Sequence, residues 1–325
     1  MKNIYTVLTL VLTLIMLLVP LFAVDNPNTS SNSGEKISQS SKEKSGTEKT
    51  GDVFRIYKND EKKTVQIPAD EYIVGVVASE VSPENAHEAL KAQALAAYTF
   101  AYRKRVQNTS AEYDLTTDSS LDQGYLDENG RKQKWGEKFS QYEEKIKSAA
   151  NAVKGKIIAY NGEAILAAYH GISPGKTESA LNVWGTDYPY LTACQSVGDL
   201  LAPEYLSEVT VTVNEFEEKI KALGITPSSE PQKYIGNLKK SESGTVLELE
   251  ICGTKSNGKT VRSAFGLRSA AFDVTFGDGK FTFTVQGYGH GVGMSQFGAN
   301  YMALQGSDYK EIILAYYKGV EIIDV

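Results

Sequence analysis

An uncharged segment near the N-terminus constrains this chain more than any other feature of its sequence. Lys2 precedes a run from Ile4 to Val24 without a charged residue, and about 20 apolar residues are enough for a helix to span a membrane. The run is long for the apolar part of a signal peptide, and Leu21-Phe22-Ala23 is a poor cleavage site. We therefore expect residues 1–24 to be an uncleaved membrane anchor rather than a removed signal. The positive-inside rule then places Lys2 in the cytoplasm and the rest of the chain outside it.

The segment after this anchor is predicted to be a flexible linker over residues 25–52. Ser, Asn, Lys and Glu dominate it, and large apolar residues are nearly absent. Such a composition cannot bury enough apolar surface to offset the entropy lost on ordering. The folded part is therefore predicted to be residues 53–325, a length that suits one large domain or two modest ones. We expect a single folded region there.

Charge and composition narrow the classes of partner and site. Hydrophobic residues make up 41% of the 325 residues and charged residues 23%, as in an ordinary globular protein. The formal net charge of -6 argues against nucleic acid as a partner, because nucleic acid needs a basic surface. Two cysteines, Cys194 and Cys252, and three histidines are too few for a Cys/His zinc site unless carboxylates complete it. We expect no metal or other cofactor, and we favour two separate buried thiols over a disulfide, although the spacing leaves both open.

The first part of the folded region mixes strand and helix patterns. Residues 53–67 predict two short strands joined by a charged turn, and residues 68–71 open a helix whose apolar side chains recur at helical spacing. Ser82 is a good N-cap and Pro83 suits the first helical position, so a second helix is expected over residues 83–105. That helix is rich in alanine, which allows a neighbouring element to pack closely.

The remaining elements complete an α+β pattern. Asn161-Gly162 lies between two apolar runs and predicts a hairpin over residues 157–170 with a type I′ turn, whereas residues 112–136 are polar and irregular. Further strands are expected at 209–213, 246–251 and 281–286, and further helices at 142–153, 215–223, 294–305 and 308–317. Long helices with antiparallel strands, and no regular βαβ alternation, indicate an α+β fold of helices packed on antiparallel strands.

Glu80 is the first candidate for a catalytic residue. It ends the apolar helix in the segment Val76-Val77-Ala78-Ser79-Glu80-Val81, next to the start of another helix. A carboxyl group at such a place can be partly buried, and burial raises its pKa as general acid catalysis near neutral pH requires. The alternative is that Glu80 only caps the backbone N–H groups at the start of the following helix.

Two loops supply the other candidates. In Tyr169-His170-Gly171-Ile172-Ser173, a strand delivers a histidine into a Gly/Ser/Pro loop, where functional side chains are common. The alternative is a histidine that hydrogen-bonds loop backbone. In residues 287–296, four glycines alternate between a strand and a helix, which suits either a backbone that approaches a ligand or a tight connection held by packing. The second loop lacks the Lys-Ser/Thr ending of a phosphate-binding loop.

These blocks together resemble the SpoIID family, also called the SpoIID/LytB or amidase-enhancer family. The resemblance covers nearly all of residues 53–325 and rests on segments in the right order: residues 70–80 (DEYIVGVVASE), 89–97 (ALKAQALAA), Tyr169-His170, Val183-Trp184-Gly185, 188–191 (YPYL) and 287–299 (GYGHGVGMSQFGA). It implies a role in endospore formation, in which peptidoglycan remodelling drives engulfment. It also implies an extracytoplasmic domain held in the space between forespore and mother cell.

The resemblance further implies a lytic transglycosylase that cleaves between N-acetylmuramic acid (MurNAc) and N-acetylglucosamine (GlcNAc), leaving a 1,6-anhydro sugar. The catalytic Glu of the family corresponds to Glu80. The supporting or substrate-binding residues that it suggests are Lys91, Gln93, Tyr169, His170, Ser173, His290, Ser295 and Gln296. One carboxyl group suffices for such a reaction, since the sugar's own 6-hydroxyl replaces the water that ordinary glycosidases activate with a second carboxylate.

The sequence departs from the family pattern at two places, and other functions remain open. Tyr98 stands where the family often has Arg, and residues 112–135 lack the Cys and His that bind zinc in some clostridial relatives. The family suggests two partners, a SpoIIP-like amidase/endopeptidase and a SpoIIM-like membrane protein. The main alternative function is a non-catalytic, peptidoglycan-binding activator of a cell-wall amidase. A less favoured one is a hydrolase that pairs His170 with Ser173 or Cys194, for which no triad motif is present.

Overall fold

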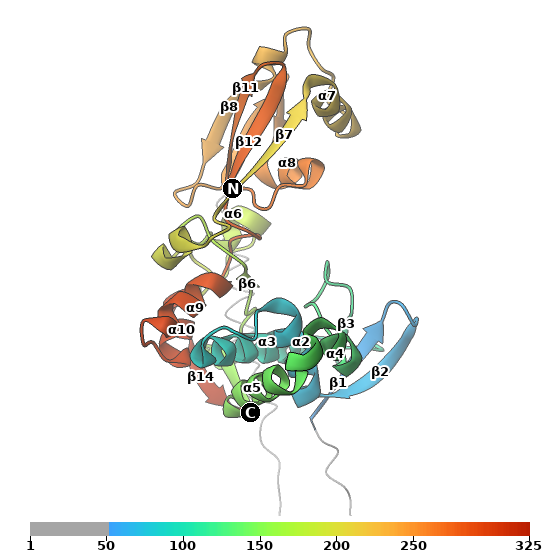
Figure 1. Cartoon of the computed structure of the whole chain (residues 1–325), viewed down its shortest axis with the longest axis vertical. Coiled ribbons are helices and arrows are strands. Elements are labelled where there is room, and N and C mark those ends of the chain that lie inside the picture. The colour runs from blue at the N-terminus through green and yellow to red at the C-terminus, as the bar shows by residue number, and fades with distance from the viewer. Residues whose placement is uncertain (1–51) are drawn as a thin grey trace, which may run out of the picture. The chain divides into compact units, whose positions relative to one another are not determined.

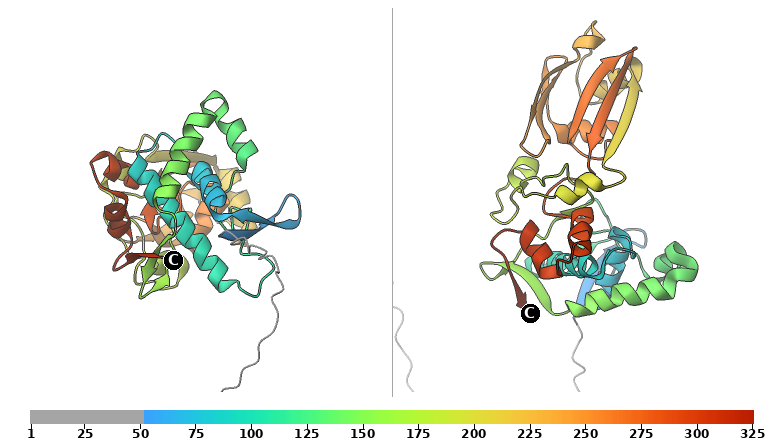
Figure 2. Two further views of the ribbon diagram at one scale, coloured as in Figure 1. Left: turned by 90° about the horizontal axis from the view of Figure 1, so that it is seen from below. Right: turned by 60° about the vertical axis from the view of Figure 1, so that its left-hand side comes forward.

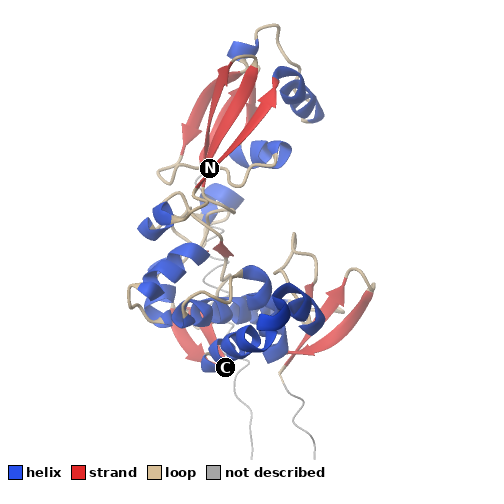
Figure 3. Cartoon of the chain, viewed as in Figure 1, coloured by secondary structure: helices blue, strands red, loops and turns tan. Residues whose placement is uncertain are grey.

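The computed structural model describes residues 52–325, which belong to one compact unit. Helices are mixed with strands that pair mostly antiparallel, so the α+β class is confirmed (Figure 3). The predicted anchor at 1–24 and nearly all of the predicted linker at 25–52 lie outside the described residues. Within residues 52–325, no helix has both the length and the apolar character that crossing a membrane requires.

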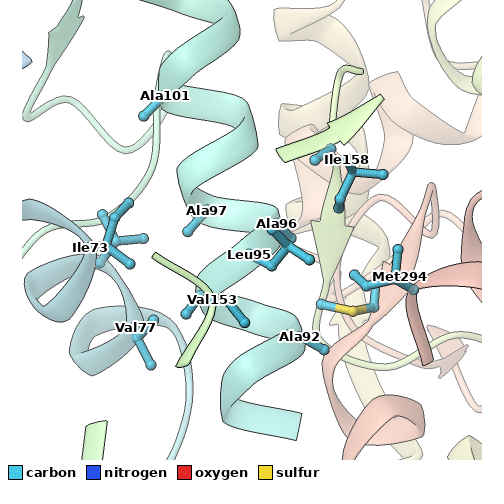
Figure 4. Packing of buried hydrophobic residues seen from close by; sticks show 14 of the residues in the cluster. Ile73, Val77, Ala92, Leu95, Ala96, Ala97, Ala101, Val153, Ile158 and Met294 are labelled. Atoms are coloured by element: carbon cyan, nitrogen blue, oxygen red, sulfur yellow. The ribbon is translucent and has the colours of Figure 1, made fainter. Parts of the chain in front are cut away.

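The central element of the larger core is the helix α3 (His87–Gln107). It packs against four other helices (Figure 2): α2 (Ala69–Glu80), α5 (Phe139–Ala152), α9 (Gln296–Leu304) and α10 (Tyr309–Tyr316). Figure 4 shows Ile73 and Val77 of α2 on one side of α3, with Ile158 and Met294 on the other. The alanines of α3 are almost all fully buried, because only small side chains let so many elements approach one helix.

The predicted start of the second helix is wrong by four residues. Ser82 does not cap a helix: its Oγ accepts a hydrogen bond from the backbone N–H of Glu84 at 3.2 Å, which closes a local turn. Helix α3 begins only at His87, after Ala86 and without a side-chain cap. The two strands before α2 are confirmed as the antiparallel pair β1 (Val53–Lys58) and β2 (Lys63–Pro68). A serine before proline therefore forms a turn here rather than a helix N-terminus.

Residues 112–136 are more ordered than their polar sequence predicts. They contain β3 (Leu115–Thr116), which pairs in parallel with β1, and α4 (Glu128–Trp135), whose N-cap Asp127 accepts a hydrogen bond from Gly130. The side chain of Arg131 is completely buried and ion-paired with Glu143 at 2.9 Å. A polar segment can enter the core in this way, because the buried charge is neutralised by a partner.

The predicted hairpin at 157–170 is confirmed at its turn and shorter than expected. Strands β4 (Lys156–Tyr160) and β5 (Glu163–Ala164) flank Asn161 and Gly162, whose φ angles of 52° and 78° fit a type I′ turn. The chain then leaves this sheet, and β14 (Glu321–Asp324) pairs with the other edge of β4. Further along, β6 (Tyr169–His170) pairs in parallel with the distant β13 (Met294–Ser295).

Residues 206–286, here called the inserted unit, form a separate group of strands and helices (Figure 1). This unit has a hydrophobic core of its own. One antiparallel sheet has the order β11-β12-β7 and a second has the order β10-β9-β8. Phe216 lies at the centre of this core and stacks on Phe281 with ring centroids 4.0 Å apart. The elements of the unit are β7 (Leu206–Thr212), α7 (Val213–Ala222), β8 (Ile235–Lys240), β9 (Val246–Ile251), β10 (Thr254–Ser256), α8 (Gly258–Phe265), β11 (Phe272–Gly277) and β12 (Lys280–Gln286).

In the C-terminal half, the strands and helices with the clearest apolar patterns are confirmed. Strands β7, β9 and β12, helix α7 and the last two helices are confirmed within a few residues, although Met294 and Ser295 form β13 rather than the start of α9. The strands β8, β10 and β11 and the helix α8 of the inserted unit were not predicted, nor were the strands β13 and β14. Short helices complete the chain: η2 (Gly136–Lys138), α6 (Ala180–Trp184), η3 (Val197–Leu201) and η4 (Pro231–Lys233).

Two distant segments, residues 168–173 and 287–295, run side by side with their main chains in contact. The N–H of Met294 donates to the carbonyl of Ala168 at 3.0 Å, and Ile172 and Tyr288 exchange hydrogen bonds of 3.0 and 2.7 Å. A Cβ atom on Gly293, whose φ is 74°, would lie 2.0 Å from the oxygen of Ala168. Of the two interpretations of the glycine-rich loop, the structure therefore supports the tight connection held by packing.

Gly293→Ala is expected to destabilise the fold far more than the same substitution at another glycine with a similar positive φ angle. Gly279 is the matched control: its φ is 71°, and a Cβ there would meet no atom within 4 Å. Left-handed backbone alone costs an alanine about 1–2 kcal/mol, and we expect Gly293→Ala to lose at least about 2 kcal/mol more through overpacking. Urea denaturation of both variants measures the difference, and equal losses would contradict the packing explanation.

Candidate active site

The Glu80 carboxyl group lies at the end of α2 and lines a cavity of about 910 Å³, here called the Glu80 cavity. Its Oε1 accepts a hydrogen bond from the backbone N–H of Gly124 at 2.9 Å. It does not cap the following helix, because α3 begins after Ala86 with no side-chain cap. The capping alternative for Glu80 is therefore wrong, and its carboxyl group is available to a ligand in the cavity.

Burial raises the pKa of Glu80 above the ordinary value for glutamate. Three influences act in the opposite direction and lower its pKa: the N–H of Gly124, the side chain of Gln296 and the positive charge of Lys134. Lys134 is held nearby, since its Nζ donates to the backbone oxygen of Ala78 at 2.8 Å. Burial outweighs all three, so the carboxyl group keeps its proton to a higher pH than an exposed glutamate does.

A second cavity, of about 500 Å³, also reaches Glu80 and is here called the Phe100 cavity. Glu80, Ser119 and Tyr169 line both cavities, so the carboxyl group lies where the two meet. Such a site can accept an extended ligand that continues on both sides of the reacting bond. A polymer substrate fits this arrangement better than a small molecule bound at a closed end.

The segment at Gln123 and Gly124 connects the acid to the strand that carries His170. The Tyr169 hydroxyl donates to Gln123 Oε1 at 2.8 Å. A Cβ atom on Gly124 would lie only 2.6 Å from the Ser79 hydroxyl and 3.1 Å from Glu80 Oε1. Gly124 and Lys134 were both missed from the sequence, because they lie in the segment interpreted as irregular and neither carries a motif signal.

The two histidines of the site are neutral and lie against each other. Burial lowers the pKa of His170 to about 4 and that of His290 to about 3, and their ring centroids are 5.8 Å apart. His170 Nδ1 lies 3.1 Å from the oxygen of Val292, and His290 Nδ1 accepts from the N–H of the same residue at 3.0 Å. Trp184 packs on His290 with centroids 5.3 Å apart. The pair therefore forms an aromatic, uncharged wall.

Of the other predicted polar residues, Gln296 lies beside Glu80, Gln93 reaches the site only through Tyr169, and Lys91 lies away from it. The buried side chain of Gln93 lies beside the hydroxyl of Tyr169, whose pKa burial raises and Gln93 lowers. Gln296 lines the Glu80 cavity. Lys91 instead forms an ion pair with Glu88 at 2.6 Å and lies over the ring of Tyr309. It lines neither cavity, and Lys134 is the lysine whose charge acts on Glu80.

Ser173 and Ser295 were predicted to support or bind substrate, and the structure gives them another partner. Both are completely buried and donate to the same carboxylate, that of Asp199, at 2.5 and 2.7 Å. The N–H of Ser173 also donates to Asp199, at 2.8 Å. Because their hydroxyls are used inside the protein, the prediction that Ser295 binds sugar hydroxyls is wrong. Their role is to join the two segments that carry His170 and Gln296.

The hydrolase alternative finds no support in the geometry. Ser173 Oγ is bound to Asp199, and Cys194 Sγ lies 3.2 Å from Thr177 Oγ1 with its pKa raised by burial. Neither is hydrogen-bonded to His170, whose Nδ1 faces a backbone oxygen. Both cysteines are free thiols, as the sequence favoured, although Cys252 is only half-buried. Among residues 52–325, no three His, Cys, Asp or Glu side chains are grouped as metal ligands.

Tyr98, which stands where the family often has Arg, lies away from Glu80. Its hydroxyl donates to Asp52 Oδ2 at 2.6 Å, and Asp52 also forms an ion pair with Arg105. Tyr98 lines neither the Glu80 cavity nor the Phe100 cavity. The tyrosine therefore makes a contact near the start of β1, and it does not line the site around Glu80.

Comparison with known proteins gives a consistent result. The sequence model of the SpoIID family, described as "Stage II sporulation protein", matches residues 57–160. The chain is 39% identical to stage II sporulation protein D of Bacillus amyloliquefaciens over 271 residues, which is 82% of this chain and 77% of that protein. It is 36% identical to the protein of the same name from Bacillus subtilis over 270 residues, which is 82% of this chain and 78% of that one.

A more distant relative is the amidase enhancer of Bacillus subtilis, which is 26% identical over 303 residues, 76% of this chain and 40% of that protein. The two sporulation proteins exceed it in identity and are matched over most of their length. The resemblance inferred from the sequence blocks is thereby confirmed, and this chain belongs to the SpoIID family of stage II sporulation proteins.

Proposed function

We propose that this protein is a lytic transglycosylase that cleaves the bond between MurNAc and GlcNAc in peptidoglycan glycan strands. The observation that carries the proposal is the Glu80 carboxyl group, partly buried with a raised pKa at the junction of two cavities. A carboxyl group that keeps its proton to a higher pH than usual can protonate a glycosidic oxygen. Cavities on both sides of it suit a strand that continues in both directions.

The surroundings of Glu80 favour chemistry with one carboxyl group rather than two. Two other carboxylates line these cavities, and each is ion-paired: Asp122 with Lys104 at 2.9 Å, and Glu204 with Arg268 at 2.7 Å. Among the described residues that line these two cavities, Glu80 is the only carboxyl group without such a pair. Ordinary hydrolysis needs a second carboxylate for water or a covalent intermediate. Attack by the sugar's own hydroxyl does not.

The proposed reaction uses Glu80 first as acid and then as base. Its proton passes to the oxygen of the glycosidic bond, and the bond from C1 of MurNAc to that oxygen breaks. The 6-hydroxyl of the same MurNAc forms a new bond to C1 and gives its proton to the Glu80 carboxylate. The products are a 1,6-anhydro MurNAc end and a free GlcNAc hydroxyl, and Glu80 is protonated again. Gly124 N–H and Gln296 can hold the carboxylate between the two transfers.

The cellular setting that we propose follows from the sequence and the family. Residues 1–24 anchor the protein in the membrane, and residues 53–325 act on the wall between forespore and mother cell during engulfment. A SpoIIP-like amidase/endopeptidase and a SpoIIM-like membrane protein are the proposed partners. The second candidate function is a non-catalytic activator of a cell-wall amidase, which the distant relation to the amidase enhancer favours.

Purified full-length protein is expected to release anhydro-MurNAc ends from purified glycan strands, as detected by mass spectrometry. Glu80→Gln removes the transferable proton while keeping an oxygen for Gly124 N–H, and should lower the rate by about a hundredfold or more. Glu84→Gln is the control, because Glu84 is exposed and hydrogen-bonded to Tyr142. Reducing ends in place of anhydro ends would point to hydrolysis. Strand binding without cleavage by the wild type would select the activator function.

The pH profile tests the assignment of Glu80 as the acid. Lys134 lowers the pKa of Glu80, so Lys134→Gln should raise that pKa. The protonated form is the active one, and kcat/KM falls as pH rises through this pKa. The alkaline limb of the profile should therefore move to higher pH in Lys134→Gln. Lys132→Gln, on the same helix with its lysine paired to Glu128, should leave the limb in place. An unchanged limb in Lys134→Gln would contradict the assignment.

A further inference from the structure

Arg262 extends the site from the inserted unit. This residue of α8 lines the Glu80 cavity and also a third cavity, of about 330 Å³, here called the Lys259 cavity. Trp184 and His290 line both the Lys259 cavity and the Phe100 cavity. The three cavities thus share lining residues. Because Arg262 and Glu80 line the same cavity, a strand seated on Glu80 can reach the side chain of Arg262.

The charge of Arg262 has no counter-charge among residues 52–325. Its Nε donates to the backbone oxygen of Leu267 at 3.3 Å, and no carboxylate pairs with it within the described part of the chain. Arg268, six residues further on, is by contrast paired with Glu204 at 2.7 Å. Arg262 is half-buried, and this burial lowers its pKa. A guanidinium has five N–H donors in a planar fork, so most of its hydrogen-bonding capacity is open to a ligand.

The walls around Arg262 are neutral or positive. The ionisable groups that line the Lys259 cavity are Lys259, Arg262 and His290, and burial keeps His290 uncharged with a pKa of about 3. No Asp or Glu lines this cavity. In the Glu80 cavity, Glu204 is already paired with Arg268. This local excess of positive charge occurs in a chain of net charge -6, and a desolvated cation without a partner is costly to keep unless it binds an anion.

We propose that Arg262, assisted by Lys259, binds a carboxylate of the glycan strand while Glu80 acts on a neighbouring glycosidic bond. The planar guanidinium matches a carboxylate through two parallel hydrogen bonds. Peptidoglycan can offer that group from the lactyl ether of MurNAc when it is free, or from a stem peptide when one is attached. This inference deepens the proposed function and rests on it for the substrate class.

The test measures binding rather than cleavage, so it does not depend on the proposed reaction. Full-length Glu80→Gln protein is compared with the same protein carrying Arg262→Gln, Arg262→Lys or Lys259→Gln. Three ligands are used: glycan strands with free lactyl carboxylates, strands with stem peptides, and an uncharged GlcNAc oligomer. Lys255→Gln is the matched control, because it removes an exposed lysine of the same unit that pairs with Glu248. Melting temperatures identify variants that do not fold.

Arg262→Gln should weaken binding of at least one carboxylate-bearing strand by about tenfold or more, with no change for the uncharged oligomer. Loss with the peptide-free strands identifies the lactyl group, and loss with peptide-bearing strands alone identifies the stem peptide. Arg262→Lys should recover part of the affinity, and Lys259→Gln should cost about threefold. Equal losses on all three ligands, or no loss on either charged strand, would overturn the proposal. If Arg262→Gln does not fold, Arg262→Lys and Lys259→Gln are compared on the same three ligands, and the same outcomes decide.

Discussion

The close approach of residues 168–173 and 287–295 is the constraint on which the site depends. Main-chain hydrogen bonds join the two segments, and the carboxylate of Asp199 binds a serine from each. This contact brings His170 from one segment beside His290 from the other, and it places Gln296 at the start of α9 next to Glu80. Backbones can approach so closely only where side chains are absent, which explains why glycines alternate along the second segment.

The electrostatics of the site follow from burial more than from individual charges. Burial raises the pKa of Glu80 and lowers those of His170 and His290, so it shifts all three groups toward their uncharged forms. The hydrogen bond from Gly124 and the charge of Lys134 stabilise the ionised form of Glu80 without cancelling the rise in its pKa that burial causes. In the proposed reaction, Glu80 must lose and regain a proton in one cycle. A pKa shifted far in either direction would hold the carboxyl group in only one of its two forms.

Much of the fold could be predicted because periodic apolar patterns report directly on burial. The strands β1 and β2, the helix α2 and the turn at Asn161-Gly162 agree with their sequence patterns. The segment around α4 was missed because its order depends on the buried pair of Arg131 and Glu143, and partners distant in sequence leave no local pattern. The strands β8 and β10 contain no buried residue, so they lack a clear alternation of buried apolar and exposed polar side chains.

The sequence predicted which residues lie near Glu80 better than it predicted what each side chain contacts. Glu80, Gln93, Tyr169, His170 and Gln296 do come together. Lys91 does not, because residues two apart on a helix face different sides, and Gln93 is the one that points to Tyr169. Ser173 and Ser295 were interpreted as ligand contacts because nothing in the sequence marks Asp199 as their partner.

The inserted unit has a consequence for how this site assembles. Strands β6 and β13 must meet although residues 171–293 separate them, and closing a long loop costs chain entropy. The first and last residues of the unit, Leu206 and Gln286, are paired with each other across β7 and β12. Once the unit has folded around its own aromatic core, the remaining loop behaves as if it were a third as long. By the logarithmic dependence on loop length, this lowers the closure cost by about 1 kcal/mol. A long insertion at this position therefore adds little to the entropy that must be lost to bring His170 and Gln296 together.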